Sequence, residues 1–398
     1  MPPRPPEPPV FPAYCTNIVA GRTLEESCAA VERTFGAVAG IVGQRPLPVG
    51  LWLSSVAARE LSESAQGAAG LRDRLASAGI SVVTLNGFPY HDFHGAEVKH
   101  RVYEPHWADA RRAMHTELLA ELLVELVPRG TRTASISTLP LGWRAGFSTE
   151  GCGASVGVAC AFLQQLVRAL ARIEDRTGVR VTVDLEPEPG CMLDRASDVL
   201  GFFEHALHPR AGEPDPRRYL GVCHDCCHAA VMFEDQREVL RGYRDAGIRV
   251  NKVQVSSAVS ADGDPDSLAV LAGLAEPRWL HQTCVRGADG RVAFFEDIPW
   301  ALAAHPRGEW RTHFHVPVDA RRLGALGTTQ GAILECLDEV SSWPVGERPA
   351  FELETYSWDA LPADVAGAST LSQRIAAELS WLTGEMRSRG LVAVGVAR

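Results

Sequence analysis

Strand-like and helix-like patterns alternate along the whole 398-residue chain, and this alternation constrains the fold more than any other feature. Strands separated by helices are typical of α/β folds with a parallel sheet, because parallel strands need long crossover connections. The first predicted helix begins at Thr23, where Glu26 completes a capping-box signature. The other predicted helices cover roughly 104–128, 152–176, 195–208, 234–247, 265–275, 329–340 and 368–389. The predicted strands are YCTNI (14–18), VGLWLS (49–54), SVVTLNGF (81–88), TASISTL (133–139), VTVDLEP (181–187), LGVCHD (220–225), NKVQVSS (251–257), THFHVPV (312–318) and FELETYSW (351–358).

These nine strands are one more than a closed barrel of eight requires. The distance along the chain from Gln254 to Glu354 is 100 residues, more than twice a normal strand–helix unit. We interpret the excess as a long insert near residues 258–345 that covers the C-terminal mouth of the barrel. The alternative is that the first or the fourth strand is wrongly assigned. The sequence thus predicts a single (β/α)8 barrel over residues 13–392, preceded by a disordered proline-rich arm over residues 1–12.

Four of the predicted strands end in a side chain that can bind a metal. Residues at the carboxyl ends of barrel strands converge on one mouth, where oxygen atoms from four strands can surround one divalent cation. The four residues, in chain order, are Glu186, Asp225, Gln254 and Glu354. Simpler explanations exist for single members, such as an exposed loop acid at Glu186, a helix N-cap at Asp225 or a core amide at Gln254. Their joint order favours a metal site.

Alternation along the strands decides which side chains point into the barrel. In residues 181–186 the apolar side chains share the outer face, while Asp184 and Glu186 share the inner face. Lys252 also points inward, and a buried lysine needs a partner, for which Asp184 is favoured over a Schiff-base role for the lysine. Glu352 is expected one layer below Glu354, bonded to an Arg, a Lys or a backbone donor.

Several histidines are candidate substrate contacts. His228 follows Asp225 by three residues, and if the strand turns into a helix there, this spacing places both side chains on one side. His313 and His315 share one face of their segment, and such a pair can bind zinc, hold an anionic substrate, exchange protons or only bond to its neighbours. The turn-rich loop after the third strand is typical of the loops that form substrate contacts in barrel enzymes. Its candidate residues are Asn86, Tyr90, His91 and His94.

Composition excludes some classes of function. A net charge of −10 argues against a large nucleic-acid interface, which needs clustered Lys and Arg. The chain has no run of about 18 apolar residues, so no membrane span is expected. Ten Cys and no apolar leader at the start of the chain predict reduced thiols and a cytoplasmic protein. Lys99 and Lys252 are the only lysines beside 37 arginines, a bias typical of GC-rich bacterial genomes.

The order of strand-end residues resembles that of the xylose isomerase-like TIM barrels, which include sugar and sugar-phosphate isomerases and epimerases. The Gln in third place is similar to the hydroxypyruvate isomerase branch. The stretches TLNGFPY, STLPLGWR, LEPEPG, KVQVSSA, HFHVPV and ETYSW are more similar still to the metabolite traffic protein EboE family, from about Tyr14 to Trp381. The resemblance implies a substrate contact at His228 and metal binding by Glu186, Asp225, Gln254 and Glu354. It also implies partners among proteins of the same metabolite gene cluster.

Together these features predict a divalent-metal-dependent isomerase or epimerase of a small hydroxy-carbonyl metabolite, such as a sugar, sugar phosphate or cyclitol. Glu186 and Glu354 would transfer protons through a metal-stabilised enediolate, while His228 holds a substrate oxygen. The cation is Mn²⁺, Mg²⁺, Co²⁺ or Zn²⁺; oxygen ligands favour the first two, and the histidines leave zinc open. The alternatives are a non-catalytic metabolite-binding or traffic protein on the same barrel and, less favoured, an endonuclease IV-like phosphodiesterase. Related barrels often form dimers, so a homodimer is also considered.

Overall fold

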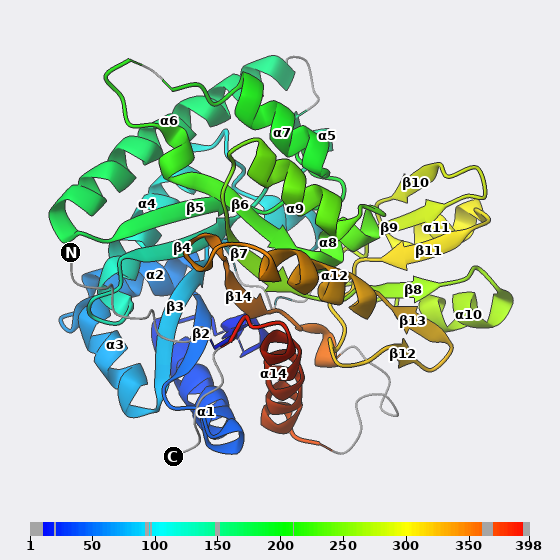
Figure 1. The fold of residues 1–398 in the computed structure, drawn as a ribbon, viewed down its shortest axis with the longest axis horizontal. Coiled ribbons are helices and arrows are strands. Elements are labelled where there is room, and N and C mark those ends of the chain that lie inside the picture. Colours follow the sequence, from blue (N-terminus) through cyan, green and yellow to red (C-terminus); the bar gives the residue numbers. More distant parts are fainter. Residues whose placement is uncertain are drawn as a thin grey trace.

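Eight parallel strands close into a barrel in the computed structural model, which describes residues 11–19, 21–91, 95, 98–147, 152–209, 211–359 and 369–392. The strand order around the barrel is β1-β14-β7-β6-β5-β4-β3-β2 (Figure 1). This confirms the predicted (β/α)8 architecture. The strands are β1 (Ala13–Cys15), β2 (Leu47–Trp52), β3 (Ile80–Asn86), β4 (Thr133–Thr138), β5 (Arg180–Leu185), β6 (Leu220–Asp225), β7 (Val250–Val255) and β14 (Ala350–Leu353).

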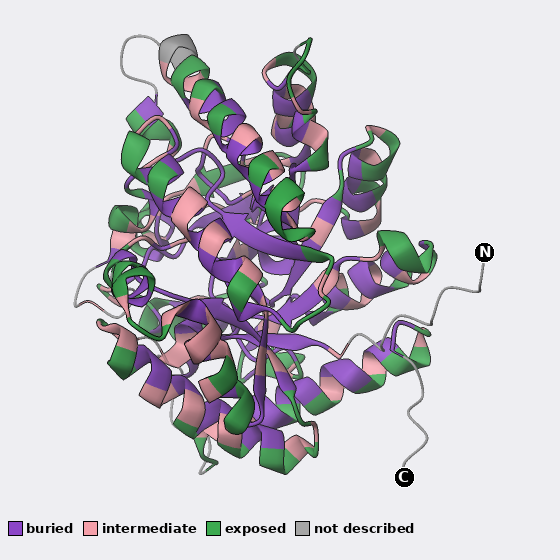
Figure 2. Ribbon diagram, turned by 90° about the vertical axis from the view of Figure 1, so that its left-hand side faces the viewer, coloured by how far each residue is buried: buried purple, intermediate pink, exposed green. Residues whose placement is uncertain are grey.

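Helices cover the outside of the barrel, and Figure 2 shows buried strands at the centre surrounded by helices with exposed outer faces. The capping box predicted at the start of α1 is confirmed, because Thr23 and Glu26 each accept the other's backbone N–H. Among the outer helices, α2, α3 and α5 were not predicted, whereas α8 begins directly after Asp225, as the spacing of Asp225 and His228 assumed. The outer helices are α1 (Leu24–Val42), α2 (Ser55–Glu63), α3 (Gly67–Ser77), α4 (Ala110–Leu126), α5 (Arg144–Phe147), α6 (Cys152–Thr177), α7 (Ala196–His205), α8 (Cys226–Val231), α9 (Gln236–Asp245), α12 (Gln330–Ser341) and α14 (Leu371–Ser388).

The two faces of the barrel strands differ sharply in polarity. Val181, Val183 and Leu185 on β5 are fully buried in the apolar layer between the strands and the outer helices. Their neighbour Asp184 points into the barrel, where Thr182 donates a hydrogen bond to it. The predicted alternation in this strand is therefore confirmed, and the barrel interior is lined by polar groups that must satisfy one another.

An insert between β7 and β14 forms a second sheet, with strand order β10-β9-β11-β8-β13-β12. Figure 1 shows it as a lobe beside the barrel. An apolar cluster that includes Trp310 and Phe314 forms its core. The strand predicted at 312–318 is wrong beyond Thr312, because β11 ends there and residues 313–318 form no strand. The segment belongs to the insert, where β11 pairs with β8 and β9. The insert elements are β8 (Val259–Ala261), α10 (Pro265–Gly273), β9 (Thr283–Arg286), β10 (Val292–Phe295), α11 (Ile298–Ala304), β11 (Glu309–Thr312), β12 (Arg322–Leu323) and β13 (Leu326–Thr328).

Residues 1–10 of the predicted arm lie outside the described residues, so the arm and the 13–392 boundary stay predictions. Within α6, Ser155–Thr177 is long and apolar enough to cross a membrane by length and composition. Half of its most apolar stretch is buried inside the structure, where α6 packs on α4 and β5 as an outer barrel helix.

A candidate metal centre at the mouth of the barrel

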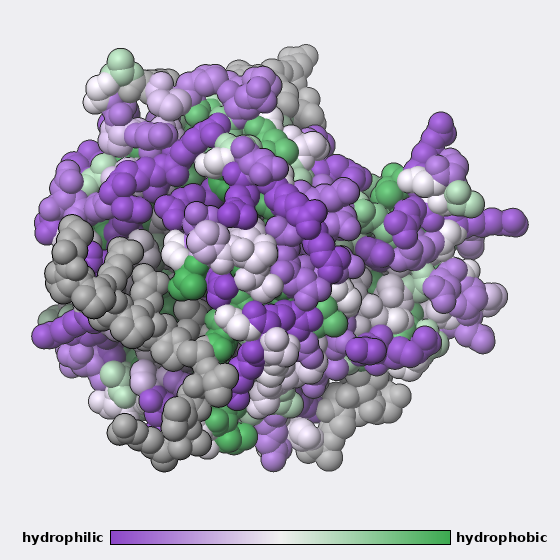
Figure 3. Space-filling view, in the orientation of Figure 1, coloured by the Kyte–Doolittle hydropathy of each residue, from purple (hydrophilic) through white to green (hydrophobic). Residues whose placement is uncertain are grey.

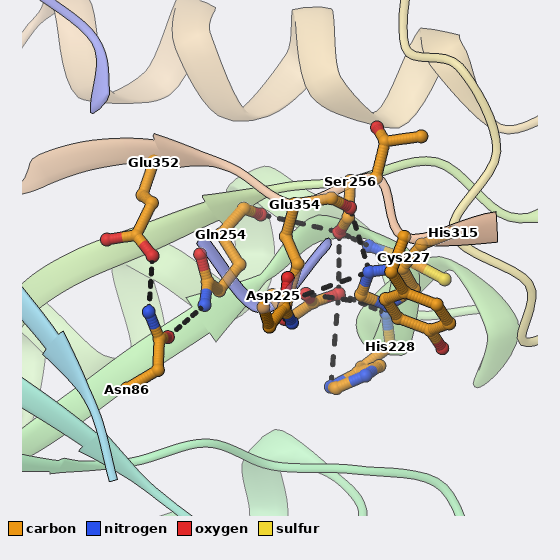
Figure 4. Close-up of polar contacts among 12 residues, drawn as sticks. Asn86, Asp225, Cys227, His228, Gln254, Ser256, His315, Glu352 and Glu354 are labelled. Carbon is orange, nitrogen blue, oxygen red and sulfur yellow. Dashed lines mark hydrogen bonds and ion pairs between the residues drawn. The ribbon is translucent and has the colours of Figure 1, made fainter. Parts of the chain in front are cut away.

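Three buried carboxylates meet where the barrel strands end. Asp225 is the last residue of β6, while Glu186 and Glu354 directly follow β5 and β14. One oxygen of each lies within 4.8 Å of the others. Figure 4 shows Asp225 and Glu354 beside Gln254, at the end of β7. The structure therefore brings together all four residues that the sequence proposed as metal ligands.

Asp225 has one engaged and one free oxygen. Its Oδ1 caps α8 by accepting the backbone N–H of His228 at 2.8 Å, and it also accepts the Ser256 hydroxyl at 2.8 Å. Its buried Oδ2 has no hydrogen-bond partner among the described residues. The helix-cap and metal-ligand interpretations of Asp225 are thus compatible, because different oxygens serve them.

A buried lysine fixes the orientation of the Gln254 amide. Lys252 Nζ donates to Asn86 Oδ1 at 2.7 Å, and because an ammonium group can only donate, this atom must be the Asn86 oxygen. Gln254 therefore approaches Asn86 Oδ1 with its nitrogen, at 2.9 Å, so its oxygen is the end of the amide that is not bonded to Asn86. Gln254 Oε1 is buried and has no partner within the described part of the chain. These contacts therefore leave the neutral Gln254 oxygen available as a metal ligand.

The predicted pairing of Lys252 with Asp184 is wrong. Lys252 Nζ lies 3.1 Å from Glu352 Oε2, and both side chains are fully buried. In the strand order, β14 with Glu352 is the direct neighbour of β7, whereas β5 with Asp184 is two strands away. Asp184 instead accepts hydrogen bonds from Ser135, Thr182 and Asn251. Glu352 lies below Glu354 and is bonded to a lysine, as the sequence predicted.

Burial and mutual repulsion dominate the electrostatics of the carboxylates. Burial, followed by the charges of Glu354 and Asp225, raises the pKa of Glu186 well above its usual value. Burial and then the charge of Asp225 raise the pKa of Glu354 to about 8. Asn17 Nδ2 donates to Glu354 Oε1 at 2.6 Å and offsets only part of this cost. A cation among these oxygens would stabilise their ionised forms.

The unpartnered atoms fit a divalent cation bound by oxygen. Glu186 Oε2, Asp225 Oδ2 and Gln254 Oε1 are buried acceptors for which the described residues offer no donor. A buried acceptor without a partner costs on the order of 1–3 kcal/mol. Carboxylate and amide oxygens are the ligands that hard cations such as Mg²⁺ and Mn²⁺ prefer. The residues present therefore suit such a cation.

Three histidines border the carboxylates. His228 lies on α8, while His313 and His315 lie on the segment that follows β11 of the insert. The ring centroids of His228 and His313 are 4.6 Å apart, and His315 lies 4.9 Å from His313. Burial lowers the pKa of His228 to about 3 and that of His315 to about 4. All three imidazoles are buried, and the structure groups them as one cluster.

A cavity lies over these residues at the mouth of the barrel. Barrel and insert both line it, which agrees with the predicted cover over the mouth. Asn86 is part of the lining, but Tyr90 and His91 are not: the Tyr90 ring packs edge-on against His115 of α4. Their predicted substrate contacts stay predictions, and His94 lies outside the described residues. The lining residues are Asn17, Asn86, Phe88, Pro89, Lys99, Val102, Tyr103, Glu186, Glu188, His228, Gln254, Trp279, Leu280, Gln282, His313, His315, Glu354 and Tyr356.

The sequence did not single out several residues of this lining. Glu188 is buried and accepts hydrogen bonds from the Tyr103 hydroxyl at 2.6 Å and from Gln282 Nε2 at 3.1 Å. Burial raises the pKa of Glu188 to about 7. Glu188 carried only a weak indication in the sequence, namely its position two residues beyond the candidate ligand Glu186. Tyr103 and Gln282 carried none, because their role depends on the packing of the insert against a distant loop.

Comparison with known proteins places the fold. No protein-family profile and no curated protein matches the sequence. Among solved structures, a xylose isomerase-like TIM barrel protein from Mycobacterium smegmatis in complex with magnesium matches with TM-score 0.51 and 11% identity, over 95% of this chain and 97% of that one. A D-tagatose 3-epimerase-like protein matches with TM-score 0.46 and 12% identity, over 94% and 98%. A D-allulose 3-epimerase from Methylomonas sp., in complex with D-allulose, matches with TM-score 0.38 and 11% identity, over 62% and 72%. The closed parallel barrel and the first of these likenesses show that the chain has the xylose isomerase-like TIM barrel fold.

Proposed function

We propose that this chain is a divalent-metal-dependent isomerase or epimerase of a small hydroxy-carbonyl metabolite. One observation carries the proposal: one oxygen from each of three buried carboxylates lies within 4.8 Å of the others, and two of these residues, Glu186 and Glu354, line the cavity. The orphaned amide oxygen of Gln254 lies at the same end of the barrel. Such a set of ligands is costly to bury without a cation, so it indicates a site that binds one.

Glu186 and Glu354 are the proposed proton-transfer groups. When bound, the cation would polarise the substrate carbonyl and offset the charge of the enediolate. One carboxylate removes the proton beside the carbonyl, and the other returns a proton to the substrate. Return to the neighbouring carbon gives isomerisation, whereas return to the opposite face gives epimerisation. His228 holds a substrate oxygen.

The charge of the cavity favours an uncharged substrate over a sugar phosphate. Three acidic side chains line it, and Lys99 is the sole Lys or Arg among the described lining residues. Lys99 is already paired with Asp297 of the insert at 2.8 Å. Trp279 and Tyr356 supply aromatic faces that can pack against the apolar side of a sugar or cyclitol ring.

Membership of the EboE family forms part of this proposal. It is supported by the stretches LEPEPG, KVQVSSA, HFHVPV and ETYSW, which contribute Glu186, Gln254, His313, His315 and Glu354 to the site. A cytoplasmic location, a homodimer and partners from the same metabolite gene cluster belong to the same proposal.

Exchange of substrate protons with deuterated water tests the reaction. With Mn²⁺ or Mg²⁺ present, the protein should catalyse exchange on at least one member of a panel of ketoses and cyclitols, measured by mass spectrometry. Glu186→Gln and Glu354→Gln should each lower this rate by about 100- to 10,000-fold, because each removes an acid–base group. Glu204→Gln, at an exposed acid, is the matched control and should leave the rate unchanged.

Two outcomes would contradict the proposal. Full exchange in both glutamine variants would show that the acid–base assignment is wrong. Binding of panel members by the metal-loaded protein without any exchange would instead support a metabolite-binding or traffic protein on the same barrel.

A further inference from the structure

A second cavity lies at the opposite end of the barrel from the carboxylates. Thr133, Arg180 and Ala350, the first residues of β4, β5 and β14, are part of its lining. The strands of a parallel barrel all begin at one end, so this cavity lies at the end that the proposed reaction does not use. Most of the side chains that line it are polar, which calls for an explanation of its own.

Positive charge is concentrated in this cavity. Four arginines line it, in a chain whose net charge is −10. Glu347 is the one acid among the described lining residues, and it is already paired with Arg244 at 3.3 Å. The cavity therefore departs from the acidic balance of the chain. The four lining arginines are Arg180, Arg218, Arg249 and Arg348.

Two of these arginines have no acidic partner within the described ranges. The exposed side chain of Arg249 forms no hydrogen bond or ion pair there. Arg348 is held by carbonyl oxygens alone. Its Nε, Nη1 and Nη2 donate to the carbonyls of Trp343, Gly390 and Ser341 at 3.1, 3.0 and 2.9 Å. These bonds fix the guanidinium group without neutralising it, and they leave two of its five N–H groups unused.

The other two lining arginines share one carboxylate. Arg180 Nε and Arg218 Nη2 lie 3.2 and 2.6 Å from the same atom, Glu174 Oε1. Glu174 also accepts the Tyr219 hydroxyl at 2.8 Å. One negative charge thus serves two guanidinium groups, and both keep N–H groups that can bind further oxygens.

The deeper part of the cavity is bonded to a buried acid. Ser135, Thr182 and Asn251 line the cavity, and each donates a hydrogen bond to Asp184. The protein itself therefore satisfies this carboxylate, and an added anion would bind nearer the arginines. Even with the charge of Asp184 included, guanidinium groups outnumber carboxylates in and beside the cavity.

We propose that this cavity binds a small metabolite that carries two or more negative charges on phosphate or carboxylate groups. The planar guanidinium fork matches both kinds of oxyanion, and more than one charge is needed to balance the excess of arginine. Arg249 and the unused N–H groups of Arg348 bind the charged oxygens. A ligand at this end does not reach the proposed reacting groups, so it acts as an effector or a stabilising ligand and not as the substrate. The proposal does not depend on the reaction assigned above.

Calorimetric titration of the full-length protein with pyrophosphate and with citrate tests this site. After metal ions are removed with a chelating resin, at least one of the two anions should bind at low salt, with one site per chain. Arg249→Gln should weaken this binding by about 10- to 100-fold, because it removes charge-assisted hydrogen bonds. Arg291→Gln is the matched control: it changes the net charge equally, but Arg291 is an exposed residue of the insert, so the affinity should not change.

Two further comparisons identify the ligand chemistry and the place of binding. The tighter of pyrophosphate and citrate shows whether phosphate or carboxylate groups are preferred. A Glu186→Gln/Glu354→Gln double variant should bind the anion as the wild type does, because its changes lie at the other end of the barrel. Circular dichroism confirms that each variant is folded. The proposal would be overturned by the absence of saturable binding of both anions at millimolar concentration, by equal losses in Arg249→Gln and Arg291→Gln, or by a loss of binding in the double variant.

Discussion

Lys252 illustrates how one side chain can organise a polar barrel interior. It is fully buried, pairs with Glu352 and donates to Asn86, which in turn orients Gln254. Burial acts to lower the pKa of Lys252, but the charge of Glu352, helped by neighbouring groups, outweighs this and the pKa is raised. The lysine is therefore charged, and it positions a proposed metal ligand without touching the metal.

We predict that Lys252→Met lowers the free energy of unfolding by about 3–5 kcal/mol, because it leaves the Glu352 carboxylate buried without its cation. The double variant Lys252→Met/Glu352→Gln should recover part of this loss. Urea unfolding followed by circular dichroism measures both effects. Lys99→Met is the control: Lys99 is partly exposed, and its partner Asp297 keeps two backbone N–H donors, from His281 and Ile298, so the loss of Lys99 should cost less than the loss of Lys252. Equal effects at the two lysines would contradict this account.

At the level of single elements, β2 shows how a strand accommodates the polar interior. Gly50 lies at the point where the Glu352 side chain crosses β2, and a Cβ atom there would lie 2.0 Å from the Glu352 carboxylate. No real side chain tolerates that distance, so the strand must carry glycine to let Glu352 reach Asn86 and Lys252. The sequence of β2 thus depends on a residue more than 300 positions away in β14.

Gly50→Ala should destabilise the protein by at least about 1–3 kcal/mol, the usual cost of overpacking a rigid core. Gly201→Ala is the matched control, because a Cβ at Gly201 in the interior of α7 meets nothing within 4 Å. This control should be neutral or stabilise the protein by about 0.5–1 kcal/mol. Thermal unfolding of the two variants under one condition provides the comparison. A Gly50→Ala variant as stable as the wild type would show that Glu352 can move aside.

Stability against pH is a property of the whole molecule, and buried groups with shifted pKa values set its slope. His115 on α4 is buried, and burial, followed by the charge of Arg112, lowers its pKa to about 3. The unfolded chain therefore binds a proton at this position below about pH 6.5, while the folded protein does not. The contribution of His115 to the free energy of unfolding is therefore fully present above pH 6.5, and it is lost as the pH falls toward 3.

His115→Leu should flatten the acid side of the stability profile. Between pH 6.5 and pH 5 the histidine accounts for about 2 kcal/mol of lost stability, which the leucine variant should not show. Urea unfolding at a series of pH values measures the slope. His205→Leu, at an exposed histidine, should leave the slope unchanged. If the free energy of unfolding changed with pH in the same way in His115→Leu and in the wild type, a depressed pKa at His115 would be contradicted.

The surface of the molecule has a mixed character. Figure 3 shows mainly hydrophilic residues on the face seen in Figure 1, with apolar residues in small separate areas. Trp300 on α11 is the most exposed large apolar side chain described, at 71%. A homodimer stays a prediction.

Local patterns were enough to predict the barrel and the four residues at its strand ends. The alternation in 181–186 placed Glu186 inside, and the carboxyl ends of parallel strands must share one mouth, so the meeting of Glu186 with Glu354 followed without knowledge of the full structure. The capping box at Thr23 was equally local. Such predictions succeed because each depends on residues near one another in the chain or on a rule common to all barrels.

Only the tertiary structure decided the remaining features of the site. Strand order around the barrel gave Lys252 the partner Glu352 instead of Asp184. Folding of the insert brought His313 to within 3.2 Å of His228, from 85 residues away, and Gln282 fixed which nitrogen faces it. The sequence by itself determined which side chains point inward, because that depends on the period of a strand. It could not determine which of them touch, because contact depends on how distant segments pack.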